Sequence, residues 1–105
     1  MSNEIFALKI ITEVGTARSY FIEAIRSAKN NDFIAAHEQL ELGDKHYIAG
    51  HREHTNLVVQ ESRGEGIEMT LLLTHAQDLL MSAEAFKILA TEFIDLYKLF
   101  HKGHQ

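Results

Sequence analysis

The chain has 105 residues, of which 46% are hydrophobic, and it lacks both proline and cysteine. This length predicts one small domain, residues 1–105, that gains stability from self-association. The net charge is −5 and no block of Lys or Arg occurs, which argues against nucleic acid or an anionic membrane as partner. Without cysteine there is no disulfide and no thiol nucleophile. No signal peptide or membrane span is recognisable, so we expect a cytoplasmic protein without membrane insertion.

The first predicted helix spans about residues 3–29. The absence of proline permits long helices, and apolar residues recur along this segment at helical spacing. Either Ser2 or Asn3 is predicted to cap its N-terminus. The positions that we expect to face the core are Ala7, Leu8, Ile11, Val14, Phe21, Ile22, Ile25 and Ala28.

The second predicted helix begins after a turn at residues 30–32, with Asn31 or Asp32 as its cap, and ends at a turn over residues 62–66. Each glycine within a helix costs about 1 kcal/mol relative to alanine. We therefore expect Gly43 and Gly50 to mark close helix packing rather than breaks. The predicted core stripe comprises Phe33, Ala36, Leu40, Gly43, Tyr47, Gly50, His54 and Leu57.

The third predicted helix runs from about Ile67 to His101 and carries two stripes. Two short connections between three long helices predict an all-α, antiparallel up-down-up three-helix bundle. Such a bundle buries one stripe of this helix, so the other predicts symmetric self-association. The first stripe comprises Met69, Leu72, Leu73, Ala76, Leu80, Ala83, Phe86, Ala90, Phe93 and Tyr97. The second stripe comprises Leu71, His75, Asp78, Ser82 and Leu89.

A histidine, an amide and a carboxylate interrupt the apolar run 71–81, at His75, Gln77 and Asp78. Burying polar groups without partners costs several kcal/mol, so the run predicts a site at the seam of an oligomer. His75 is either a hydrogen-bonded core histidine or a group for proton transfer, metal binding or nucleophilic attack. Asp78 either pairs with a basic residue or binds a metal with its symmetry mates, because clustered carboxylates repel one another.

The run Leu72–Met81 resembles the signature of the lactose/cellobiose-type enzyme IIA of the bacterial sugar phosphotransferase system. Further similarity lies at residues 17–19, at residues 28–33 and at Glu65-Gly66, so the resemblance covers nearly the whole chain. It implies a homotrimer of three-helix chains. It also implies a phosphotransferase component that accepts a phosphoryl group from HPr and passes it to a cysteine of enzyme IIB. The membrane enzyme IIC is then an indirect partner.

The resemblance assigns roles to three residues. His75 matches the phosphorylated histidine and Gln77 matches the glutamine of the phosphate site. Asp78 matches the aspartate that meets its symmetry mates around a metal on the threefold axis, and one Mg²⁺ per trimer is expected. The resemblance also implies a disaccharide of the lactose, cellobiose or chitobiose class as the sugar, without identifying which one.

Two positions depart from the family pattern. Leu79 stands where the family has a second histidine, and His54 replaces a glutamine within Gly50–Thr55. We expect His54 to be a neighbour of the active histidine, contributed by the second helix. The departures keep a second hypothesis open, a noncatalytic trimeric regulatory or interaction module that retains the family's shell.

Three further polar residues have weaker interpretations. Arg18 is expected either to form an inward ion pair or to reach the phosphate, with a structural role favoured. His101 and His104 in the tail are expected to be solvated.

Overall fold

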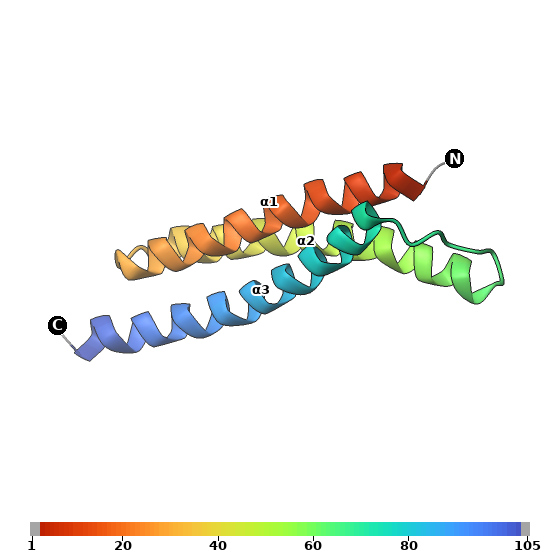
Figure 1. The fold of residues 1–105 in the computed structure, drawn as a ribbon. Coiled ribbons are helices and arrows are strands. Elements are labelled where there is room, and N and C mark those ends of the chain that lie inside the picture. Colours follow the sequence, from red (N-terminus) through yellow and green to blue (C-terminus); the bar gives the residue numbers. More distant parts are fainter. Residues whose placement is uncertain (1–2, 104–105) are drawn as a thin grey trace.

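A computed structural model describes residues 3–103 as three long helices joined by two short connections (Figure 1). α1 spans Asn3–Lys29, α2 spans Phe33–Ser62 and α3 spans Leu71–Gly103. The bundle is elongated, 59 × 19 × 19 Å, and α1 packs more extensively on each of the other helices than α2 and α3 pack on one another. The predicted all-α three-helix bundle is confirmed.

The buried side of α1 follows a strict alternation of three- and four-residue steps, as in a coiled-coil seam. The sequence analysis did not predict that Ile10, Ala17 and Ala24 are buried. Its prediction that Leu8 faces the core was wrong, because Leu8 is 53% exposed. Alanines let α1 lie close to both neighbours, so its buried seam is narrower and straighter than the apolar pattern suggested. The buried positions are Ala7, Ile10, Val14, Ala17, Phe21, Ala24 and Ala28.

The start and the glycines of α2 agree with the sequence. The Asp32 carboxylate accepts a hydrogen bond from the backbone nitrogen of Ala35 (3.1 Å), so Asp32 is the cap. A Cβ added at Gly43 would lie 2.6 Å from the Phe21 ring, and one at Gly50 would lie 2.6 Å from Val14. Both glycines therefore mark close helix approach. The cap considered at Ser2 lies outside the described residues.

α3 begins at Leu71, four residues after the predicted start at Ile67. The Thr70 hydroxyl accepts a hydrogen bond from the backbone nitrogen of Leu73 (3.1 Å), which is the action of an N-cap. Residues before Thr70 therefore stay outside the helix, and Met69, predicted to be in the core, is 52% exposed. Further along, Ile94 takes the buried position in place of the predicted Phe93.

The second stripe of α3 is left uncovered by the chain itself. Leu71 is 87% exposed and Leu89 is 50% exposed. The stripe continues at the same spacing through Leu96 and Leu99, which are also exposed. The intrachain core therefore uses only one side of α3, as the sequence predicted.

His101 near the end of α3 is less solvated than expected. His101 is half-buried, hydrogen-bonded to the backbone carbonyl of Lys29 (3.2 Å) and packed edge-on against Phe33. The expectation of a solvated His101 was wrong because α3 reaches the α1–α2 turn, while His104 lies outside the described residues. Among residues 3–103 Arg18 forms no ion pair, so the inward ion pair considered for it is not observed. Its guanidinium lies 5.5 Å from the centre of the Phe86 ring instead, a packing contact within the chain.

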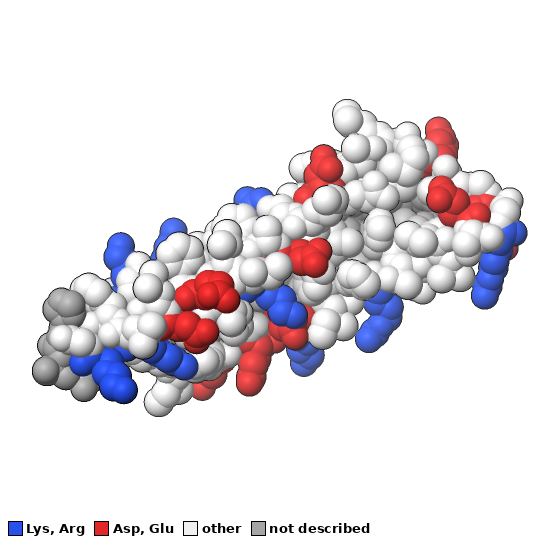
Figure 2. Space-filling model, turned by 90° about the horizontal axis from the view of Figure 1, so that it is seen from below, with Lys and Arg blue, Asp and Glu red and all other residues white. Residues whose placement is uncertain are grey.

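The surface seen from below in Figure 2 mixes charges of both signs. Lys and Arg side chains lie singly among acidic ones, and no large basic patch appears on this face. Within residues 3–103, no helix is long and apolar enough to cross a membrane.

Candidate functional site

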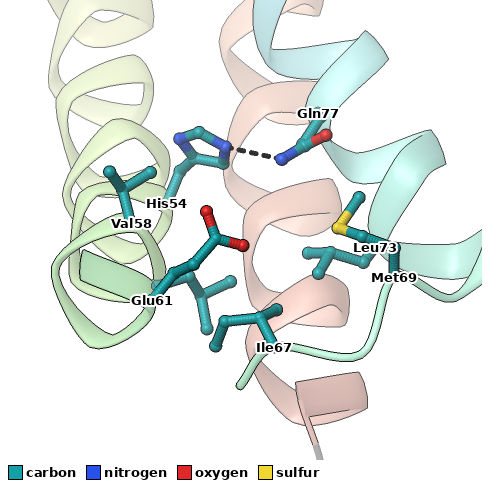
Figure 3. Close-up of a pocket in the computed structure, with 8 residues that line it drawn as sticks. His54, Val58, Glu61, Ile67, Met69, Leu73 and Gln77 are labelled. Carbon is teal, nitrogen blue, oxygen red and sulfur yellow. Dashed lines mark hydrogen bonds between the residues drawn. The ribbon is translucent and has the colours of Figure 1, made fainter. Parts of the chain in front are cut away.

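His54 on α2 and Gln77 on α3 face one another across the bundle (Figure 3). The amide nitrogen of Gln77 lies 3.0 Å from Nε2 of His54. An amide nitrogen donates hydrogen bonds and does not accept them, so His54 Nε2 is the acceptor. The His54 ring in this arrangement is therefore neutral and carries its proton on Nδ1.

Partial burial favours the neutral ring. It lowers the pKa of His54 below the usual histidine value, and repulsion from His51, one turn earlier on α2, lowers the pKa further. Both causes disfavour the imidazolium form, which has no free lone pair to accept the Gln77 hydrogen. The electrostatics of the site and its hydrogen bond therefore agree.

A small cavity of about 40 Å³ adjoins this pair. Small-molecule sites usually occupy about 300–1,000 Å³, so the cavity is too small to hold a disaccharide. Glu61, which sequence reasoning did not single out, points into it from the last turns of α2 (Figure 3). The cavity is lined by His54, Leu57, Val58, Glu61, Ile67, Met69, Leu73 and Gln77.

His75 and Asp78 occupy the other side of α3. Both side chains are exposed, and neither forms a hydrogen bond or ion pair with the residues described, 3–103. They are three positions apart and therefore neighbours on the second stripe. The sequence placed these polar groups at a buried seam, but a single chain leaves them in solvent.

The structure separates the predicted site residues into two pairs. Residues two apart in a helix do not share a face, and Gln77 points to α2 whereas His75 belongs to the second stripe. The sequence contained the signal for this: Gln77 lies between Leu73 and Leu80 at core spacing, and both leucines are buried. His54 was expected beside the active histidine, and its observed partner is Gln77.

Asp78 is the predicted metal ligand. Among the residues that the structure describes, no group of three or more His, Asp or Glu side chains is placed to hold a metal ion. The Asp78 carboxylate, which has no ion-pair partner in the described part of the chain, is the kind of oxygen donor that Mg²⁺ prefers. The residue therefore fits such an ion if symmetry supplies further carboxylates.

Comparison with known proteins identifies the family. Residues 5–98 match the family described as "PTS system, Lactose/Cellobiose specific IIA subunit". The lichenan-specific phosphotransferase enzyme IIA component of Bacillus subtilis is 41% identical over 86% of this chain and 82% of its own length. The lactose-specific EIIA component of Staphylococcus epidermidis is 34% identical over 90% of this chain and 91% of its own.

A solved structure agrees with this result. The crystal structure of the cellobiose-specific enzyme IIA from Bacillus anthracis is 38% identical, with a TM-score of 0.93 over 97% of this chain and 94% of that one. Sequence and fold therefore agree along nearly the whole chain. The chain belongs to the lactose/cellobiose-specific IIA subunits of the sugar phosphotransferase system, and as such it is a phosphotransferase component.

Proposed function

We propose that this chain is a cytoplasmic phosphoryl carrier that accepts a phosphoryl group from HPr on His75 and passes it to a cysteine of enzyme IIB. The step serves uptake, through the membrane enzyme IIC, of a disaccharide of the lactose, cellobiose or chitobiose class. The observation that carries the proposal is the exposed imidazole of His75, free of hydrogen-bond partners among residues 3–103, on a stripe of a IIA-family helix that also exposes Leu71 and Leu89.

The chemistry needs little beyond this imidazole. A ring nitrogen of His75 attacks the phosphorus, and the bond from phosphorus to the donor breaks with its electron pair leaving on the donor. In the second transfer the cysteine thiolate of enzyme IIB attacks, and the phosphorus–nitrogen bond breaks. Catalysis of phosphoryl transfer is mostly positioning and charge stabilisation, which suits an exposed residue that docks two proteins in turn.

We further propose a homotrimer built on the second stripe. Four leucines, Leu71, Leu89, Leu96 and Leu99, expose large side chains along one line of α3. Burying each leucine contributes roughly 1.5–3 kcal/mol. Asp78 lies on the same line, so three carboxylates would meet at the axis. One Mg²⁺ held by the three Asp78 carboxylates would offset their repulsion.

The proposed trimer would also allow Gln77 to contact the phosphoryl group. His75 and Gln77 of one chain project from different sides of α3, so one chain does not bring them together. In the proposed assembly, His75 of one chain points toward the α2–α3 surface of the next. We propose that Gln77 serves the phosphoryl group on His75 of a neighbouring chain.

A second candidate is a noncatalytic regulatory module, which the replacement of the family's histidine by Leu79 favours. Incubation with phosphoenolpyruvate, the upstream kinase and HPr separates the two. We expect mass spectrometry at alkaline pH to show one phosphate per chain, lost in His75→Ala and retained in His37→Ala, a matched control on α2. An unmodified wild-type chain would support the regulatory module, and full labelling of His75→Ala would remove His75 from the reaction.

A further inference from the structure

We propose that His54 is a positioning residue that fixes the amide of Gln77 and thereby aims its second hydrogen at the phosphoryl group. The pairing stands on the geometry of the bundle, whereas its consequence for transfer rests on the proposed function. The two parts are tested by separate measurements below.

The hydrogen bond to His54 determines what Gln77 can offer a ligand. A glutamine amide has two N–H donors and one carbonyl acceptor in one plane. In the structure one donor is directed at His54 Nε2 (3.0 Å), which sets the plane and leaves the second donor with a defined direction. Donors held in place before charge arrives stabilise that charge better than donors that must reorganise.

His54 is only partly exposed to solvent. It belongs to the core-facing stripe of α2, one turn before Leu57, which is only 4% exposed. His54, Leu57 and Leu73 from α3 all line the small cavity. The ring therefore has apolar support, and partial burial keeps it in the neutral form that accepts a hydrogen bond.

Within residues 3–103, no donor other than Gln77 forms a hydrogen bond with His54 Nε2. The charged or titratable groups near the ring are Glu61, which shares the cavity, and His51, which interacts with it electrostatically. His51 is turned to Thr55, 3.4 Å away, and a carboxylate cannot donate. Gln77 is therefore the donor that occupies Nε2 among the residues described.

A glutamine at position 54 offers a conservative test. Its carbonyl oxygen accepts a hydrogen bond from the Gln77 amide nitrogen just as His54 Nε2 does. His54→Gln should therefore preserve the orientation of Gln77, whereas His54→Leu keeps comparable bulk and removes the acceptor. A role of His54 in packing alone would not separate these variants in this direction, because leucine packs at least as well as glutamine.

The first measurement tests the pairing without phosphorylation. Long-range ¹H–¹⁵N NMR at pH 7.5 reports which ring nitrogen of a histidine carries the proton. We expect the Nδ1–H tautomer at His54, opposite to the form that free histidine prefers, and we expect Gln77→Leu to shift His54 toward the ordinary Nε2–H form. An Nε2–H tautomer in the wild type, unchanged by Gln77→Leu, would overturn the proposal.

The second measurement tests the consequence by quenched-flow transfer from phosphorylated HPr. We expect His54→Leu to slow transfer about tenfold, the size expected when one orienting hydrogen bond is lost. His54→Gln should stay within about threefold of the wild type, since a hydrogen bond of similar strength replaces the first. His37→Leu, another histidine replacement on α2, should leave the rate unchanged.

Equal rates in His54→Leu and the wild type would contradict the positioning role, as would a folded His54→Gln that is as slow as His54→Leu. If His54→Leu fails to fold, the tautomer measurement and the transfer rate of His54→Gln still test the positioning role of His54. A wild type that takes no phosphate would refute the proposed function alone, because the NMR result judges the pairing independently.

Discussion

The core-facing side of α3 and its second stripe are both rich in apolar residues, yet only the first is covered within one chain. On the core-facing side Leu73 and Leu80 are buried, and Gln77 between them has a partner in His54. On the second stripe Leu71 is 87% exposed, and His75 and Asp78 have no partner among residues 3–103. The difference teaches that one side of α3 stabilises the single chain, whereas the second stripe contributes little to the intrachain core and is the surface that we propose for assembly.

The largest expected effect is dissociation of the proposed trimer, which tests whether the second stripe of α3 forms the interface between chains. Leu96→Asp places a charge on this stripe in every chain, and each lost leucine contact removes roughly 1.5–3 kcal/mol. We expect light scattering to show dissociation of the proposed trimer, with helical circular dichroism retained. Leu42→Asp makes the same exchange at an exposed position of α2 and should leave the trimer intact, and dissociation of both variants would argue against the stripe.

A substitution inside the intrachain core should act on stability instead. Gly43→Val places side-chain atoms against the Phe21 ring, which lies only 2.6 Å from where the first of them, the Cβ, would stand. Overpacking of this kind costs about 1–3 kcal/mol, measurable by urea unfolding. Gly15→Ala on α1, where a Cβ meets nothing within 4 Å, should stabilise the helix by up to about 1 kcal/mol.

Much of this division was visible in the sequence. The two stripes of α3 followed from helical spacing alone, and Gly43 and Gly50 were placed correctly because a helix retains glycine mainly where a backbone approaches closely. The exact seam of α1 was not predictable in the same way. Alanine and leucine both count as apolar, and only the partners reveal that Ala17 is buried and Leu8 is exposed.

The candidate site was less predictable than the fold. The motif identified His75, Gln77 and Asp78, but it did not show that Gln77 turns to α2, because side-chain pairing between helices depends on their rotation. The start of α3 was predicted four residues too early for a different reason. Thr70 is a good cap, but an apolar stretch at Ile67 and Met69 preceded it and extended the helical pattern.

The next prediction concerns phosphoryl transfer that uses His75 of one chain and Gln77 of another. Gln77→Leu should slow phosphoryl transfer about tenfold by removing one hydrogen-bond donor, and His75→Ala should abolish it. In trimers refolded from a mixture, an intact His75 from the first variant would meet an intact Gln77 from the second. We expect partial recovery of fast transfer in the mixture, and a rate equal to the mean of the separate trimers would place both residues in one chain's site.

The smallest expected effect is the pH dependence that His54 adds to stability. Its pKa is lowered in the folded chain, so below the ordinary histidine value the unfolded chain binds this proton more readily. Stability is therefore lost as the pH falls through that window. Urea unfolding at pH 7.5 and 5.5, at fixed protein concentration, should show a greater loss in the wild type than in His54→Gln, and equal losses would contradict the assignment.

The most direct test of the division between the two sides is the position of the phosphate among the seven histidines of the chain. Wild-type protein is phosphorylated to completion through HPr and mapped by tandem mass spectrometry under alkaline conditions that preserve phosphohistidine. We predict that all phosphate lies on His75, on the second stripe, and none on His54, whose Nε2 is occupied by Gln77. Phosphate on His54, or spread over several histidines, would contradict the account.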